Sequence, residues 1–253
     1  MNSTMKWAAP LVLGLVILIA WVTATKTGMV GSWALPSPGH VWRRIVSGIS
    51  NGYLLDATAQ TMTEALLGCV FGTVIGVPLG FAIAHFKPLA ASVQPYLAAS
   101  QAIPAVAIAP LLVVWVGYGM TPIVVLCTIM VVFPIIINTT VGVRSIDPDL
   151  IGAARIDGAG SLTLLGFIEL PLAAPLILAG LRNGFTLSIT GAVVGEMVVG
   201  GQTGLGILLS SAQSLNDSSG MFAAIGILAV TAISIYVVIL IIENKAHEAV
   251  SER

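Results

Sequence analysis

The fold of this chain is decided by a loop between two apolar runs, which reads Leu150-Ile151-Gly152-Ala153-Ala154-Arg155-Ile156-Asp157-Gly158 and, after nine further residues, Ile168-Glu169-Leu170-Pro171. Asp147 and Pro148 just before it are typical of a helix start, and Gly158 is placed to end that helix. Ser161 is suited to cap a second helix, and Pro171 marks the entry to the next apolar run. We therefore expect this loop to be folded.

Outside the loop the chain is too apolar for a water-soluble domain. Of its 253 residues 57% are hydrophobic and only 8% are charged, against about 25% charged in a typical soluble domain. The mean hydropathy is +1.02, so the natural solvent is a lipid bilayer. The net charge of −1 and the scattering of ten Lys and Arg residues over the whole length argue against nucleic acid as a partner.

Six apolar segments are each long enough to cross a bilayer, which takes about 20 apolar residues. They lie at about Trp7–Thr25, Ala65–Ala84, Leu89–Val116, Thr121–Thr139, Leu172–Val199 and Met221–Ile242. Their short connections leave no room for a large soluble domain. We expect an all-α membrane protein with six transmembrane helices, built as a single transmembrane domain over residues 1–253 with the folded loop at about 141–171.

Basic residues outside the spans orient the bundle, because they gather on the cytoplasmic side of a membrane protein. With the N-terminus inside, six of them fall on the cytoplasmic side and three on the outer side. The six are Lys6, Lys87, Arg144, Arg155, Lys245 and Arg253, and the three are Lys26, Arg43 and Arg44. The bias predicts that both termini and the folded loop are cytoplasmic.

The first helix of the loop is expected to expose small and apolar side chains, which a solvated loop has no reason to present. They are Leu150, Ile151, Ala153 and Ala154. Two interpretations are open at this point. The face fits into a groove of a partner, or the helix folds back under its own bundle.

Two of the spans carry features of helices that surround a cavity. Pro95, Pro104 and Pro110 break the third span, and Pro134 lies within the fourth. Broken helices at membrane depth are tolerated where protein buries them or water lines them. A transporter or a channel is therefore favoured over a simple anchor.

The second span carries a glycine at every fourth position, namely Gly68, Gly72, Gly76 and Gly80. Such a stripe on one helix face lets another helix approach closely. We expect the stripe to serve helix packing.

Glu196 is the most informative single residue in the spans, because a carboxylate there costs about 3 kcal/mol unless it finds a partner or water. It either lines or gates a solute path, or it is structural. Arg182 precedes it by fourteen residues, roughly 21 Å along a helix, so any charged partner must come from another helix or another copy. The neutral polar residues Gln101, Ser188 and Thr190 suit a low-affinity path, although such residues also serve helix packing.

No pattern in the chain predicts a catalytic site, a metal site or a nucleotide site. The glycine-rich run Gly200–Gly206 lacks the Lys-Ser or Lys-Thr of a phosphate loop. The three histidines lie in separate segments without ligand-spaced partners. Cys69 and Cys127 lie in apolar runs and are expected to act as small hydrophobic residues. We expect no cofactor on this chain.

The loop resembles the EAA loop of importer-type ABC permeases. Further segments resemble the nitrate, sulfonate, taurine and bicarbonate permease subgroup, namely Leu35–Pro38, Ile103-Pro104, Ala109-Pro110, Trp115–Gly117, Gly180–Arg182, Glu196-Met197 and Gly204–Gly206. The chain departs from the family in two places. Gly152 takes the usual position of a glutamate, and Glu64 takes a position where relatives often carry a basic residue.

This resemblance implies the fold of a type I ABC importer permease in the inner (cytoplasmic) membrane, with a cytoplasmic coupling helix. The ATPase-coupling residues would be Leu150, Ile151, Gly152, Ala153, Ala154, Arg155, Asp157, Gly158 and Pro171. The implied partners are a second copy of the chain, two cytoplasmic ATPase subunits that use ATP and Mg, and an external solute-binding protein. The solute would be small, such as a sulfonate, nitrate, bicarbonate or a related molecule.

Two other classes of function stay open. A self-contained secondary transporter would usually show an internal repeat, and the two halves show no clear duplication. A membrane scaffold would leave the folded loop and the broken spans unexplained.

Overall fold

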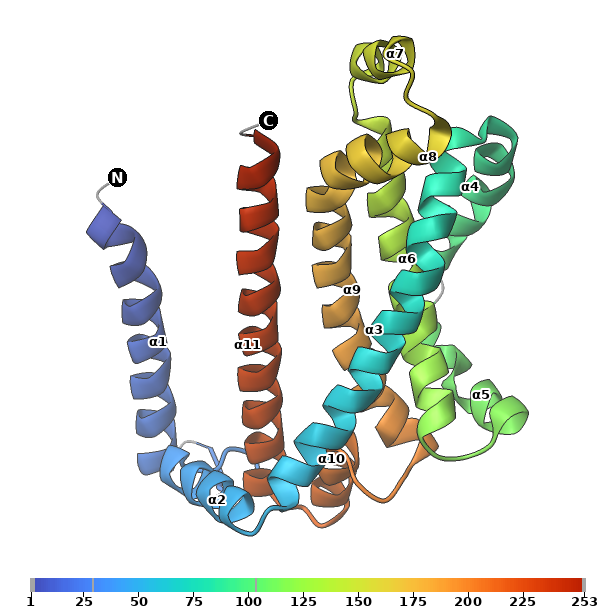
Figure 1. Cartoon of the computed structure of the whole chain (residues 1–253). Coiled ribbons are helices and arrows are strands. Elements are labelled where there is room, and N and C mark those ends of the chain that lie inside the picture. Colours follow the sequence, from blue (N-terminus) through green and yellow to red (C-terminus); the bar gives the residue numbers. More distant parts are fainter. Residues whose placement is uncertain (1–2, 29, 103, 252–253) are drawn as a thin grey trace.

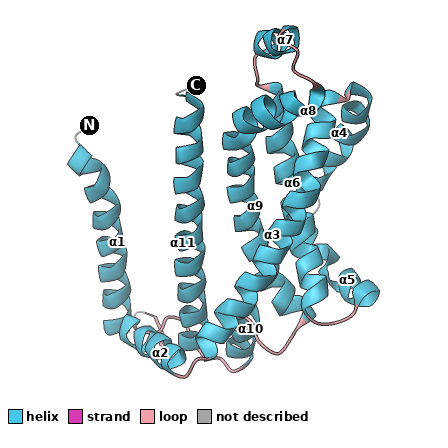
Figure 2. Cartoon of the chain, viewed as in Figure 1, coloured by secondary structure: helices cyan, strands magenta, loops and turns pink. Residues whose placement is uncertain are grey.

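The computed structural model of the chain is a bundle of helices (Figure 1), and it describes residues 3–28, 30–102 and 104–251, with side chains at 12–28, 30–100 and 104–246. Within these residues there are helices and loops but no strand (Figure 2). The expected all-α fold is therefore confirmed.

Thirteen helical elements follow one another along the described chain. They are α1 (Ser3–Lys26), α2 (Pro38–Ser50), α3 (Tyr53–His85), α4 (Lys87–Ala102), the 3₁₀-helix η1 (Ala105–Ile108), α5 (Ala109–Val116), α6 (Met120–Arg144), α7 (Pro148–Ile156), α8 (Ser161–Leu164), the π-helix η2 (Leu165–Glu169), α9 (Leu170–Val199), α10 (Leu205–Ser214) and α11 (Ser218–Ser251).

Four helices are long and apolar enough to cross a membrane, namely Tyr53–His85, Met120–Arg144, Ser161–Val199 and Ser218–Ala246. The expected third span is divided, because α4 and the η1–α5 segment meet at 88° and count as a fifth span only if taken together. The expected first span falls partly outside the described side chains, and its described part, Val12–Lys26, is shorter. The number of six spans thus stays a prediction.

The glycine stripe of α3 packs against α6, one helical turn after another. A Cβ atom added to Gly72 would lie 2.7 Å from Val131 Cγ1, and one added to Gly76 would lie 2.9 Å from Ile135 Cγ2. Gly68 meets Cys127 and Gly80 meets Thr139 in the same way. Because only hydrogen occupies these positions, the two backbones can approach closely, as expected from the spacing.

The core of the bundle lies between α3, α6 and α9. Its buried side chains include Met62, Ala65, Cys69, Cys127, Val131, Ile135, Phe185 and Ile189. The two cysteines are buried and free, as expected for small hydrophobic residues. In contrast, α1 stands apart from this core beside α11 (Figure 1) and exposes apolar side chains such as Leu13 and Ile17.

An ion pair joins α9 to α11. Arg182 Nη1 lies 3.3 Å from Glu243 Oε2, both side chains are less than one-fifth exposed, and the guanidinium lies 5.2 Å from the centre of the Tyr236 ring. Arg182 therefore pairs with Glu243 of another helix and not with Glu196. Charged side chains within membrane-spanning helices usually pair with one another in this way.

Breaking this pair is expected to destabilise the protein. Arg182→Glu alone places two carboxylates together, and Glu243→Arg alone places two guanidinium groups together, so each should cost about 3 kcal/mol. The double variant Arg182→Glu/Glu243→Arg should recover most of the loss, as measured by thermal unfolding of the purified permease. Equal destabilisation of the single and double variants would contradict a direct pair.

Candidate functional site

The first helix of the folded loop, α7, forms as its local sequence predicts. The Asp147 side chain accepts a hydrogen bond of 2.9 Å from the Asp149 N–H, and Pro148 occupies the first turn. Gly158 has a φ of +89°, a conformation that favours glycine and turns the chain after the helix. Asp147, Pro148 and Gly158 thus set both ends of α7.

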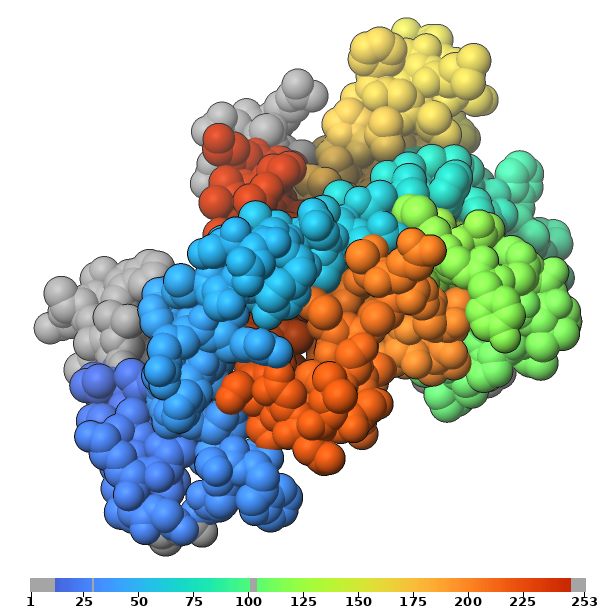
Figure 3. Space-filling model, turned by 90° about the horizontal axis from the view of Figure 1, so that it is seen from below, coloured from blue at the N-terminus to red at the C-terminus, as the bar shows by residue number. Residues whose placement is uncertain are grey.

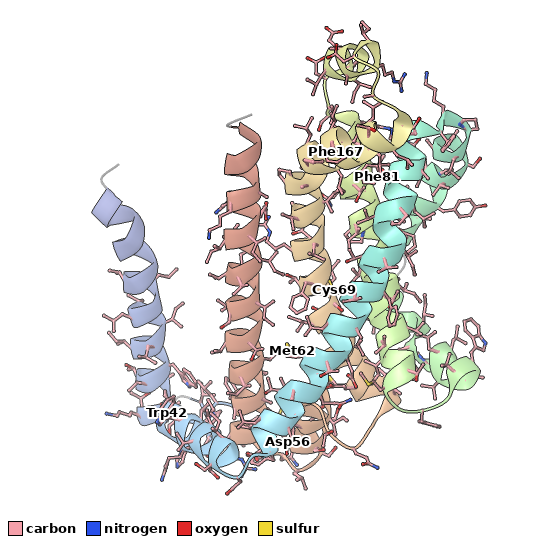
Figure 4. All side chains as sticks on the ribbon, viewed as in Figure 1. Trp42, Asp56, Met62, Cys69, Phe81 and Phe167 are labelled. Carbon is pink, nitrogen blue, oxygen red and sulfur yellow. The ribbon has the colours of Figure 1, made fainter. Side chains whose placement is uncertain are left out.

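The loop projects α7 away from the membrane helices at one end of the bundle (Figure 1). Of the predicted coupling residues Leu150, Ala153, Arg155, Asp157 and Gly158 are exposed, whereas Ile151, Gly152, Ala154 and Pro171 are half-buried. Three large apolar side chains outside the predicted coupling set are also exposed here, Ile156 (87%), Leu162 (85%) and Phe167 (79%). This end therefore presents an apolar surface, and Figure 4 shows Phe167 on it.

The second half of the loop differs from the prediction. Gly160 rather than Ser161 takes the N-cap position of α8, and Ser161 makes no capping hydrogen bond from its side chain. The chain then stays helical through Pro171 by way of the π-helix η2. Proline has no N–H to donate to the carbonyl one turn earlier in the helix, and the wider turn of a π-helix accommodates the missing hydrogen bond. Pro171 therefore lies within a continuous helical segment.

Side chains of α3 and α6 anchor this segment and the loop to the bundle. His85 at the end of α3 lies 3.0 Å from the Glu169 carboxylate through Nε2 and 2.9 Å from the Phe81 carbonyl through Nδ1. Arg144 at the end of α6 donates to the Ile83 carbonyl at 3.0 Å. Residues on both sides of the loop are thus bonded to the end of α3. No pattern in the sequence indicates the His85–Glu169 contact.

A cavity of about 730 Å³ opens beside α6, bounded by α4, η1 and α9. Among the described residues its lining carries no charged side chain and consists of Tyr96, Ala99, Ser100, Ala105, Ile108, Ile129, Met130, Phe133, Pro134, Ile137, Asn138, Asn183 and Leu187. The broken spans therefore do surround a cavity, as their prolines predicted. Its two amides, Asn138 and Asn183, were not among the predicted path residues.

The predicted path residues lie in different surroundings. Thr190 is exposed on α9 at helical spacing from Asn183 and Leu187, which line the cavity. Ser188 is fully buried, and its hydroxyl donates to the Ala65 carbonyl at 2.7 Å, so it joins α9 to α3. The side chain of Gln101 lies outside the described residues.

Glu196 lies outside this cavity, in the core near the end of the bundle opposite α7. Its side chain is 1% exposed. It accepts hydrogen bonds of 2.6 Å from the Thr61 hydroxyl and from the Gly206 N–H. These hydrogen bonds support the structural interpretation of Glu196, whose role stays a prediction.

The all-helical bundle, the protruding folded loop and the cavity among apolar helices agree with a membrane permease of an ABC importer. The chain belongs to the family described as binding-protein-dependent transport system inner membrane component, whose model matches residues 72–248. It is thus a multi-pass protein of the inner membrane that acts in transport, as its resemblance to this family predicted.

Individual relatives support the same class. The riboflavin transport system permease protein RibX of Chloroflexus aurantiacus is 39% identical over 91% of this chain and 85% of its own length. The taurine transport system permease protein TauC of Escherichia coli is 28% identical over 86% of this chain and 80% of its own length. Permeases for different solutes thus align along most of this chain.

The fold has a solved counterpart in the inward-facing methionine ABC transporter MetNI. The matched chain has a TM-score of 0.66 at 21% identity, with 78% of this chain and 96% of that chain covered. This likeness confirms the type I importer permease fold.

Proposed function

We propose that the chain is a single transmembrane domain over residues 1–253 that pairs with a second copy and is driven by two cytoplasmic ATPase subunits docked on α7. The observation that carries this proposal is the exposed apolar surface of the loop, which is bonded at its base to α3. ATP and Mg act in the ATPase subunits, and an external solute-binding protein delivers the solute.

The arrangement of the ends supports a cytoplasmic position for both termini. The start of α1 and the end of α11 lie at the same end of the bundle as α7 (Figure 1). Arg144 and Arg155 lie at that end as well, in agreement with the distribution of basic residues. In this orientation α10 and the start of α3 face the outside.

The cavity beside α6 supports a solute path between the two copies. It is half-open, and its uncharged lining combines aromatic rings of Tyr96 and Phe133 with the amides of Asn138 and Asn183. Aromatic faces and amides suit an uncharged planar heterocycle better than a sulfonate, nitrate or bicarbonate anion, which would find no cation here. A flavin-like solute also fits the 39% identity to a riboflavin permease. Thr190 extends this path, Ser188 and Glu196 hold the helices around it, and a place for Gln101 on the path stays a prediction.

Reconstitution tests this function. The permease is purified with the ATPase that co-purifies with it and placed in liposomes with ATP and Mg, together with the binding protein. We expect a complex of two permease and two ATPase chains and uptake of radiolabelled riboflavin that requires both ATP and the binding protein. Taurine in place of riboflavin tests the solute class.

Three results would overturn parts of the proposal. Uptake without an ATPase would make the chain a secondary transporter. Failure to bind any ATPase, with no uptake, would favour a membrane scaffold. Uptake of taurine but not riboflavin would leave the importer function intact and refute the heterocyclic solute.

A further inference from the structure

Two acidic side chains lie next to each other in the core near the end of the bundle opposite α7. Glu64 on α3 is 2% exposed and Glu196 on α9 is 1% exposed. Glu64 lies three residues after Thr61 on the same face of α3, and the Thr61 hydroxyl lies 2.6 Å from Glu196 Oε1, which places the two carboxyl groups side by side. Neither takes part in an ion pair in the described part of the chain. Two charged carboxylates in contact in such a site would repel each other strongly.

The groups around Glu196 are hydrogen-bond donors. Oε1 accepts from the Thr61 hydroxyl at 2.6 Å, and Oε2 accepts from the Gly206 N–H at 2.6 Å. Thr61 in turn accepts from the Leu205 N–H at 2.9 Å. These two N–H groups begin α10, where a negative charge is favourable. Glu196 is therefore the member of the pair that carries the charge.

Glu64 has the complementary pattern. Its Oε1 accepts from the Gln60 side chain at 2.8 Å, whereas its Oε2 is buried and has no hydrogen-bond partner among the described residues. A proton on Oε2 would turn this atom into a donor. The adjacent carboxylate of Glu196 is the acceptor that such a donor requires.

We propose that Glu64 and Glu196 form a proton-binding site in which Glu64 Oε2 carries one proton and donates it in a hydrogen bond to the Glu196 carboxylate. The protonated pair holds α3, α9 and the start of α10 together. Gly204 and Gly206 fit this role, because a Cβ at either position would meet the Glu196 carboxyl group. Glu64 is thus a positioning residue for the corner between α9 and α10.

Few other titratable side chains lie near Glu64 and Glu196 at the corner between α9 and α10. Among the neighbouring elements, α6 contributes Cys127, a buried free thiol, and α10 contributes no titratable side chain. Tyr118, in the turn between α5 and α6, is 83% exposed. A cavity of about 200 Å³ lined by Gln60, Glu64, Gln202 and Thr203 gives water and protons access to the site. Figure 3 shows this end of the molecule, with α10 between the start of α3 and the α5–α6 turn.

Thermal unfolding of the full-length permease in lipid nanodiscs, measured from pH 6 to pH 10, tests the site. Stability that depends on a bound proton is present at low pH and is lost as the pH rises. We expect the Tm of the wild type to fall by about 4 °C or more on the alkaline side. Glu64→Gln replaces the donating O–H by an N–H. This variant should keep the stability of the wild type, and its Tm should fall less on the alkaline side.

Three further variants complete the test. Glu64→Ala removes the donor and should be less stable than Glu64→Gln at every pH. Glu196→Gln replaces an accepting carboxylate oxygen by an NH2 group, which cannot accept from the donors that surround this side chain. It should therefore be less stable than Glu64→Gln. Glu243→Gln removes a carboxylate paired with Arg182 and, as the matched control, should retain the alkaline decline of the wild type.

Infrared spectra report the proton directly. The wild type should show a protonated-carboxyl C=O band at neutral pH that is missing in Glu64→Gln. The absence of that band in the wild type, an alkaline decline in Glu64→Gln equal to that of the wild type, or stabilisation by Na⁺ or K⁺ in place of low pH would each overturn the proposal.

Discussion

Gly72→Leu is expected to leave almost no folded permease. The new side chain would begin 2.7 Å from Val131 Cγ1 and 3.4 Å from the Thr128 carbonyl. The Thr128 carbonyl belongs to the backbone and cannot change rotamer as a side chain can. Therefore α3 and α6 would have to separate along their whole contact. Overpacking costs about 1–3 kcal/mol where side chains can move, and more is expected here. The yield of monodisperse protein after detergent extraction measures the effect.

A leucine at Gly14 is the matched control for this variant. Gly14 lies in α1 with nothing within 4 Å of an added Cβ, so Gly14→Leu should extract like the wild type. Equal losses for the two variants would indicate a general cost of leucine in a span. A normal yield of Gly72→Leu would contradict the close packing of α3 on α6.

Ala153→Trp is expected to abolish coupling without unfolding the permease. Ala153 is exposed on α7, so the large ring should be tolerated by the isolated chain. In a docked complex, the ring would hold the ATPase away from the helix. We expect more than a tenfold loss of ATP-dependent uptake and of ATPase co-purification, with an unchanged Tm of the permease alone.

Gly39→Trp serves as the control for that experiment. Gly39 lies in α2, at the opposite end of the bundle from α7 (Figure 1), and an added Cβ there meets no neighbour within 4 Å. This variant should bind the ATPase normally. Unchanged ATPase binding and uptake in Ala153→Trp would place the docking surface elsewhere.

Features that depend on neighbours in the chain were predictable from the sequence. Asp147, Pro148 and Gly158 act through local capping and turn rules, so α7 was found with its ends. The glycines of α3 indicated a close helix contact by their spacing alone. The prediction that Ser161 caps α8 was wrong, because Gly160 takes the extended conformation that an N-cap residue requires. Local capping preferences allow more than one nearby residue to start a helix, so they did not identify the N-cap residue here.

Contacts between distant residues could not be predicted in this way. His85 and Glu169 are 84 residues apart, and nothing in either segment indicates the other. Glu196 was found as a costly buried charge, but its partner Thr61 lies 135 residues earlier on another helix. The amides in the cavity were not among the predicted path residues for the same reason, since only the fold brings α6 and α9 together around the cavity.

The unbroken helical segment from α8 to α9 has a mechanical consequence. Because the π-helix replaces a loop, backbone hydrogen bonding continues from Ser161 to Val199, and a displacement at the loop is not absorbed by flexible chain. The 30 residues of α9 form a lever about 45 Å long, so a tilt of about 5° at its base would move its far end by about 4 Å. That far end carries Glu196, and in the proposed complex a movement of α7 by the ATPase subunits would therefore displace the α9–α10 corner at the other end of the bundle.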